Sequence, residues 1–136
     1  MSTLKIGICG WGNVATGLYK IAKNNIESIK KQGNLDIEIV VIGARRDNPN
    51  CKPENVIIER DIFNVVNHDI DVMVELIGGV DVAKDLILKA LKKKKHVVTA
   101  NKAVIYNHGD EIFACAKENG VKAVSYTHLT LPTMMS

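Results

Sequence analysis

The segment that decides the fold is residues 7–15, Gly7-Ile8-Cys9-Gly10-Trp11-Gly12-Asn13-Val14-Ala15. From Gly10 to Ala15 it matches the G-x-G-x-x-A form of the dinucleotide-binding fingerprint. In that fingerprint Gly10 permits a tight turn, Gly12 lets the backbone approach a pyrophosphate, and Ala15 lets the helix pack near the strand. Amides at the helix start would then face the phosphates. The alternative is a glycine turn without a ligand, which is disfavoured because the motif joins an apolar strand to an amphipathic helix.

Apolar periodicity predicts alternating strands and helices along the rest of the chain. Expected strands are 4–9, 37–43, 56–58, 71–77, 96–100 and 121–124. A helix from Val14, closed by Gly33 and Asn34, is expected first, followed by a polar loop over 45–53 and helices over 62–67, 81–95 and 109–119. This alternation predicts an α/β fold, a Rossmann-like, doubly wound, mostly parallel sheet with helices on both faces.

Composition indicates one globular domain and excludes several classes of protein. The 136 residues are 46% hydrophobic and 24% charged, with a net charge of +3 that is low for a nucleic-acid binder. The three cysteines lack a CxxC spacing, which disfavours disulfides and a metal site and favours a reducing cytoplasm. No apolar run approaches membrane-spanning length. We therefore expect a cytoplasmic domain with no nucleic-acid, membrane or metal partner.

The end of the second expected strand bears on cofactor choice. An acidic residue there favours the free ribose 2′-hydroxyl of NAD, and a basic one favours the 2′-phosphate of NADP. The chain reads Ala44-Arg45-Arg46-Asp47, and two guanidinium groups suit a phosphate. These residues predict NADP, although Asp47 keeps NAD possible. The alternative is that Arg45 and Arg46 are solvated loop charges.

Two longer motifs carry a family resemblance. Residues 71–79 read DVMVELIGG, residues 96–103 read HVVTANKA, and residues 108–111 read HGDE. Their order and spacing resemble the homoserine dehydrogenase family over residues 4–125. The resemblance implies a Rossmann-like domain of an NAD(P)-dependent enzyme, usually a homodimer. That enzyme would interconvert L-homoserine and L-aspartate 4-semialdehyde in threonine, methionine and isoleucine biosynthesis.

The resemblance also implies roles for single residues. Asn13 and Val14 would contact the cofactor diphosphate, and Arg46 would reach the 2′-phosphate. Thr99 and Asn101 would lie near the nicotinamide. Lys102 matches the family lysine at the hydride-transfer centre, which is thought to assist catalysis.

The expected strand ends agree with this placement. Ligands of open α/β sheets bind at the carboxyl ends of the strands, where Gly78-Gly79 and Asn101-Lys102 fall. A lysine ammonium there can stabilise charge on a carbonyl oxygen or relay a proton. The alternative for Lys102 is an exposed loop lysine. Glu75 lies in an apolar strand and needs a partner or backbone amides, and we expect no catalytic role for it.

Two features depart from the family pattern. The family often has a glycine where Lys94 stands, so we expect either a left-handed backbone there or a different helix end. After Ser125 the family pattern stops, and residues 126–136 are expected to be a non-native or disordered tail beyond the 1–125 domain. The chain would then bind cofactor without holding substrate. Alternatives are another NAD(P)-dependent reductase, such as a dihydrodipicolinate reductase or aspartate dehydrogenase, and a non-catalytic NAD(P)H-sensing module.

Overall fold

A computed structural model describes residues 2–24, 35–48 and 53–125, and its centre is one parallel sheet. The strands are β1 (Ser2–Cys9), β2 (Leu35–Gly43), β3 (Ile57–Glu59), β4 (Val72–Glu75), β5 (His96–Thr99) and β6 (Ala123–Ser125). Their spatial order is β3-β2-β1-β4-β5-β6, and each neighbouring pair is parallel. This is the strand order of a doubly wound dinucleotide-binding sheet, as expected.

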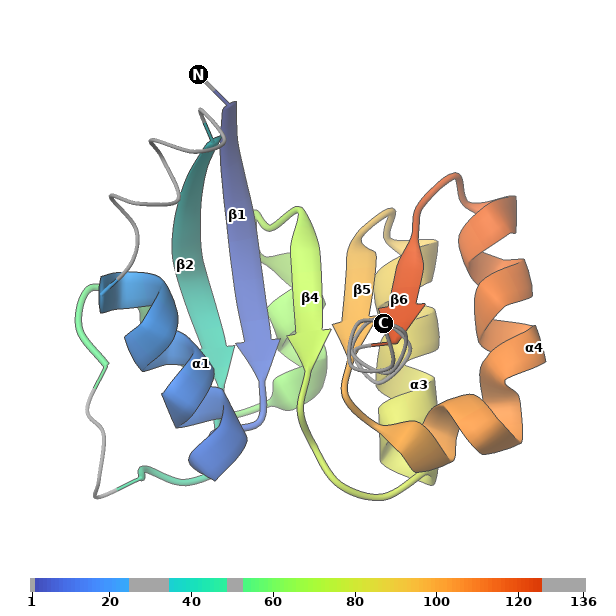
Figure 1. Cartoon of the computed structure of the whole chain (residues 1–136), viewed down its shortest axis with the longest axis horizontal. Coiled ribbons are helices and arrows are strands. Elements are labelled where there is room, and N and C mark those ends of the chain that lie inside the picture. Colours follow the sequence, from blue (N-terminus) through green and yellow to red (C-terminus); the bar gives the residue numbers. More distant parts are fainter. Residues whose placement is uncertain (1, 25–34, 49–52, 126–136) are drawn as a thin grey trace, which may run out of the picture.

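Helices cover both faces of the sheet, which confirms the predicted architecture. In Figure 1, α1 (Asn13–Asn24) lies in front of the sheet and α3 (Asp81–Lys92) lies behind it. The 3-10 helix η1 (Ile62–Asn67) and α4 (Lys102–Glu118) share one core with α3. Helices switch face at β1 because successive crossovers are right-handed and the chain runs outward from β1 in both directions.

Two aliphatic cores fill the space between these layers. Ile8, Ile42 and Val74 pack with Ala15 and Tyr19 under α1. The larger core lies on the opposite face, between the sheet and η1, α3 and α4. Alternate residues of a strand point to opposite faces, so Ile8 enters one core and Cys9 enters the other. Buried strands of this kind need branched aliphatic side chains, which explains the low aromatic content.

One helix boundary differs clearly from the prediction. The helix expected over 109–119 begins seven residues earlier, at Lys102. Asn101 precedes it, and its side-chain oxygen accepts the Val104 amide at 3.0 Å, which is an N-cap interaction. His108 has non-helical backbone angles, so the helix is kinked just before Gly109. The predicted start therefore marks the kink, and the Asn101 cap was overlooked.

The other boundaries shift by a few residues at most. β1 and β2 each begin two residues early, β3 lies one residue later, and β4 ends at Glu75 rather than Ile77. The expected helix closure at Gly33 and Asn34, part of the 45–53 loop and the 126–136 tail lie outside the described residues. Within the described part of the chain, no helix is long and apolar enough to cross a membrane.

Lys94 has the left-handed backbone suggested by its sequence position. Its φ is +66°, and two hydrogen bonds surround it, from the Lys94 amide to Leu91 O at 3.0 Å and from the Lys95 amide to Ala90 O at 3.0 Å. This pair is the Schellman arrangement that terminates many helices, and glycine is the usual residue at the left-handed position. The end of α3 therefore has the Schellman geometry although lysine, and not glycine, occupies the left-handed position.

Candidate functional site

A pocket of about 520 Å³ opens at the carboxyl ends of β1, β2 and β4. β1 pairs with both β2 and β4, so the connections after these strands diverge and leave a crevice between them. The lining comes from the loops after the three strands and from the starts of η1 and α3: Gly10, Trp11, Gly12, Gly43, Arg45, Arg46, Asp47, Asn48, Ile62, Leu76, Ile77, Gly78 and Val82. Its size suits a small ligand or a cofactor.

The glycine loop has the geometry that its sequence predicts. Gly10 has φ +105°, and a Cβ there would lie 3.0 Å from the Leu76 carbonyl oxygen, so neither the backbone nor the space tolerates a side chain. A Cβ on Gly12 would meet nothing within 4 Å, which leaves open space over the loop. Ala15 is buried beneath α1. The tight turn at Gly10 and the burial of Ala15 are as predicted, whereas the approach of a pyrophosphate to Gly12 stays a prediction.

Three backbone amides at the start of α1 have no acceptor within the helix. The first helical bond runs from the Thr16 amide to Gly12 O at 3.0 Å. The preceding amides, of Asn13, Val14 and Ala15, come before the first intrahelical bond and are free of helical partners. Together with the open space over Gly12, they fit a diphosphate group.

Trp11 is the loop residue that sequence reasoning missed. Its ring meets Tyr19 edge-on, with centroids 5.6 Å apart, and its carbonyl accepts the Asn48 side-chain amide at 3.4 Å. Tyr19 in turn accepts the Glu54 amide at 3.0 Å. These contacts fix the glycine loop against the loop after β2. A lone aromatic between two fingerprint glycines was the available signal.

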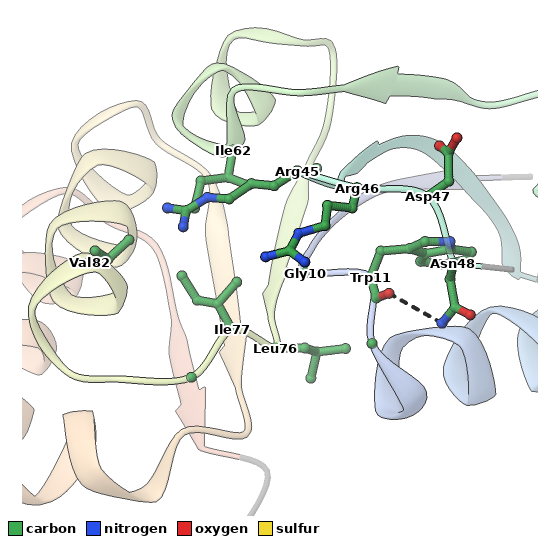
Figure 2. A pocket seen from close by; sticks show the side chains of 13 residues that line it. Gly10, Trp11, Arg45, Arg46, Asp47, Asn48, Ile62, Leu76, Ile77 and Val82 are labelled. Atoms are coloured by element: carbon green, nitrogen blue, oxygen red, sulfur yellow. Dashed lines mark hydrogen bonds between the residues drawn. The ribbon is translucent and has the colours of Figure 1, made fainter.

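The two arginines reach into the pocket from the end of β2. In Figure 2 the Arg45 side chain extends toward Val82 and Ile77, and that of Arg46 extends toward Gly10. Both residues are exposed. The Asp47 carboxylate points away from both guanidinium groups, where it accepts a hydrogen bond from Arg60 Nη2 at 2.6 Å. The pocket therefore presents two positive charges on this side.

A buried carboxylate joins the ends of β4 and β5. Glu75 is 0% exposed and accepts the Thr99 hydroxyl on one oxygen and the Ile77 amide at 2.9 Å on the other. Thr99, also 0% exposed, accepts the Asn101 amide at 3.0 Å on the same hydroxyl. Among the described residues, every buried side-chain nitrogen or oxygen has a partner. The partners of Glu75 are thus the Thr99 hydroxyl and the Ile77 backbone amide rather than a basic side chain.

Burial raises the pKa of two groups here. It raises the pKa of Glu75 above its ordinary value, and the hydrogen bonds from Thr99 and Ile77 oppose that change. Burial also raises the pKa of the neighbouring Cys9 thiol, and the Glu75 charge adds to this effect. Cys9 is therefore a protonated, buried thiol.

Asn101 connects this network to the glycine pair after β4. Its side-chain amide donates to Gly79 O at 2.5 Å and to Ile77 O at 3.3 Å, while its oxygen caps α4. Gly79 has φ +86°, and a Cβ there would meet nothing within 4 Å. Lys102 follows as the first residue of α4 and is exposed. The arrangement places an ammonium group at the carboxyl end of β5.

Apart from Asn13, Val14 and Ala15 at the start of α1, the predicted residues fall into two neighbouring groups. Gly10, Gly12, Arg45, Arg46 and Gly78 line the pocket, whereas among the described residues Gly79, Thr99, Asn101 and Lys102 lie outside its lining, at the ends of β4 and β5. The Thr99 side chain is completely buried, so direct contact of that side chain with a nicotinamide stays a prediction. Sequence reasoning also overlooked the apolar wall of Ile62, Leu76, Ile77 and Val82. In the described ranges, no cluster of three metal-ligating side chains is present.

Comparison with protein families agrees with this geometry. Residues 10–125 match the family model described as homoserine dehydrogenase, NAD binding domain. The chain is 50% identical over 122 residues to the homoserine dehydrogenase of Pseudomonas aeruginosa. That alignment covers 89% of this chain and 28% of the relative, so the chain spans less than a third of that protein's length.

Solved structures show the same fold. A crystal structure of Staphylococcus aureus homoserine dehydrogenase superimposes with a TM-score of 0.82 at 35% identity, covering 93% of this chain and 33% of that one. A hyperthermophilic archaeal homoserine dehydrogenase in complex with NADPH superimposes with a TM-score of 0.73 at 20% identity, covering 90% of this chain and 43% of that one. At that identity, the second likeness concerns the fold alone.

Proposed function

Because this chain belongs to the homoserine dehydrogenase family, as its NAD-binding domain, we propose that its pocket binds NADP(H). The observation that carries this proposal is the pair of arginine side chains extending into a crevice that a dinucleotide-binding glycine loop opens. The archaeal family member in complex with NADPH supports the choice of cofactor. NAD, which Asp47 would favour, is the competing cofactor.

Each part of the cofactor has matching groups on the chain. The diphosphate would lie over Gly12 and accept from the amides of Asn13, Val14 and Ala15. Arg45 and Arg46 would bind the ribose 2′-phosphate. The nicotinamide end would extend along Gly78 and Gly79 toward the end of β5. Asn101 would position that segment through its bond to Gly79 O.

In the whole enzyme, we propose interconversion of L-homoserine and L-aspartate 4-semialdehyde. A bound nicotinamide supplies hydride transfer in such a reaction. On this chain Lys102 would stabilise the charge that develops on the substrate oxygen, or relay its proton. Lys102 suits this role because α4 presents it, exposed, at the strand end beside Asn101.

The setting of the whole enzyme belongs to the same proposal. The chain spans 28% of the Pseudomonas relative, so groups that hold the amino-acid substrate would come from the rest of such a protein. We propose a cytoplasmic homodimer that serves threonine, methionine and isoleucine biosynthesis. Residues 1–125 would form its cofactor domain, consistent with a family match that ends at residue 125.

Coenzyme titration of the purified chain tests the cofactor proposal. Trp11 is the sole tryptophan of the sequence and lines the pocket, so its fluorescence reports binding directly. Replacing Arg45 and Arg46 together by Ala should weaken NADPH binding by about tenfold or more, because each charge-assisted bond contributes about 1.5–3 kcal/mol. NADH binding should change by less than about twofold, since NADH lacks the 2′-phosphate.

A matched control is Lys117→Ala, which removes a positive charge from an exposed position on α4. It should leave both affinities unchanged. Equal losses of NADPH and NADH affinity in the arginine variant would contradict the 2′-phosphate assignment. Failure of the folded wild-type chain to bind either coenzyme would contradict the proposed function itself.

A further inference from the structure

Asp47 presents a problem for NADP binding that the arginines alone do not solve. It lies directly after Arg45 and Arg46 and lines the same pocket. A carboxylate at the end of the second strand accepts hydrogen bonds from a ribose 2′-hydroxyl and repels a 2′-phosphate. The loop therefore contains groups for both cofactors, and its selectivity depends on which of them face the ligand.

Arg60 binds the Asp47 carboxylate on the side away from the two arginines. It follows β3 directly, and its guanidinium donates from Nη2 to Asp47 Oδ1 at 2.6 Å and from Nη1 to Ala44 O at 3.1 Å. One planar group thus binds both ends of the turn that carries the two arginines. Figure 2 shows the outcome, since the Asp47 carboxylate points away from the Arg45 and Arg46 guanidinium groups.

The pairing of β2 with β3 places Arg60 next to the turn that it contacts. β2 and β3 are parallel, with Gly43 opposite Glu59, and the ladder continues in the bond from the Ala44 amide to Glu59 O at 2.9 Å. Arg60 therefore leaves β3 beside the residue at which the turn begins. Its side chain needs no long reach to contact Ala44 O and Asp47.

We propose that Arg60 is a specificity-determining residue, which makes the turn after β2 a 2′-phosphate site by holding Asp47 outward and neutralising its charge. This inference rests on the proposed binding of a nicotinamide dinucleotide. Without Arg60 the carboxylate can rotate toward the pocket, where it repels a phosphate or pairs with Arg45 or Arg46. Either event lowers the affinity for the 2′-phosphate and makes an acceptor available to a 2′-hydroxyl.

The expected effect is modest because the ion pair is exposed. The Arg60 and Asp47 side chains are 54% and 85% exposed, so water and salt screen their interaction. Couplings of exposed pairs correspond to changes of about threefold to fivefold in affinity at most. The effect should shrink further as salt is added.

The test compares NADPH and NADH affinities of the full chain, measured by Trp11 fluorescence at low salt. Arg60→Gln should raise the Kd for NADPH about threefold to fivefold and leave the Kd for NADH unchanged or lower. The double variant Arg60→Gln/Asp47→Asn should recover the NADPH affinity of Asp47→Asn alone, because no carboxylate remains to be restrained. Lys117→Gln, with an equal charge change on α4, is the control and should alter neither Kd.

Two results would overturn the inference. One is an NADPH-to-NADH affinity ratio that does not change in Arg60→Gln, whether both affinities stay the same or fall equally, and the other is a double variant that fails to recover NADPH binding. Circular dichroism and the urea midpoint of each variant establish that the chain is folded. If the wild-type chain bound neither coenzyme, the proposed function would fail and this inference with it, whereas normal binding with an unchanged ratio would remove the inference alone.

Discussion

Replacing Thr99 by Val tests how much the Thr99 hydroxyl, which lies between Glu75 and Asn101, contributes to the stability of the chain. Valine keeps the branched shape of threonine and substitutes a methyl group for the hydroxyl. In the wild type that hydroxyl donates to the Glu75 carboxylate and accepts the Asn101 amide at 3.0 Å. Both Thr99 and Glu75 are completely buried, so water cannot replace the lost bonds.

The cost follows from these two bonds. A hydrogen bond to a charged group contributes about 1.5–3 kcal/mol, and one to a neutral amide contributes about 1 kcal/mol. The added methyl group returns about 0.8 kcal/mol of apolar burial. We therefore expect Thr99→Val to lower the free energy of unfolding by about 2–3 kcal/mol, a large share of the 5–15 kcal/mol typical of a domain.

Thr99→Ser is the matched comparison, because serine keeps the hydroxyl and loses only a methyl group, at about 1 kcal/mol. Urea unfolding followed by circular dichroism measures both variants. With a slope of about 2 kcal/mol per molar urea, the midpoint should fall by about 1 M or more for Val and by about 0.5 M for Ser. A valine variant as stable as the serine variant would refute the reasoning, since it would mean that packing, and not the hydroxyl, determines stability at this site.

Three further predictions concern the same region and the end of α3. Asn101→Ala should weaken NADPH binding while sparing adenosine 2′,5′-bisphosphate, because it removes only the bonds to Ile77 O and Gly79 O and the α4 cap. Asn107→Ala, which removes an exposed bond on the same helix, is the control for calorimetry of both ligands. Burial raises the pKa of Glu75 above 4.5, so its contribution to stability is fully present below pH 4.5 and is lost as pH rises through the raised value. The unfolding free energy of the wild type relative to Glu75→Gln should therefore fall as pH rises above 4.5, and a constant difference in urea titrations would contradict this. Lys94→Gly should stabilise the chain by about 0.5–1 kcal/mol in the same assay, since its φ of +66° suits glycine, and a destabilised variant would argue against the left-handed assignment.

Much of the fold could be predicted from the sequence because its signals are local. The position of Gly10 has a positive φ and no room for a Cβ. Glycine meets both requirements, and the fingerprint motif identifies this position in the sequence. The alternation of apolar strands and amphipathic helices indicated the doubly wound sheet, which places the strand ends at one edge. Arg45, Arg46 and Gly78 could therefore be assigned to a common site before any contact was known.

The predictions that failed or fell short depended on interactions between distant segments. α4 begins at Lys102 because Asn101 caps it, and the same Asn101 side chain is held by carbonyls of Ile77 and Gly79, more than twenty residues away. The Thr99 hydroxyl likewise donates to Glu75 in the neighbouring strand, 24 residues earlier in the chain. Neither partner can be identified from the residues that flank Thr99 or Asn101 in the sequence.

The amino-acid sequence by itself determined the glycine loop, the order of elements and the positive turn after β2, since backbone preference and apolar period act over a few residues. Only the tertiary structure decided which way Asp47 points and which groups hydrogen-bond to Glu75. These outcomes require Arg60 to lie beside Ala44 and Thr99 beside Glu75, and parallel strand pairing brings both pairs together. The free energy of a charge depends on such neighbours, so it is set by the folded arrangement of the chain rather than by residue order.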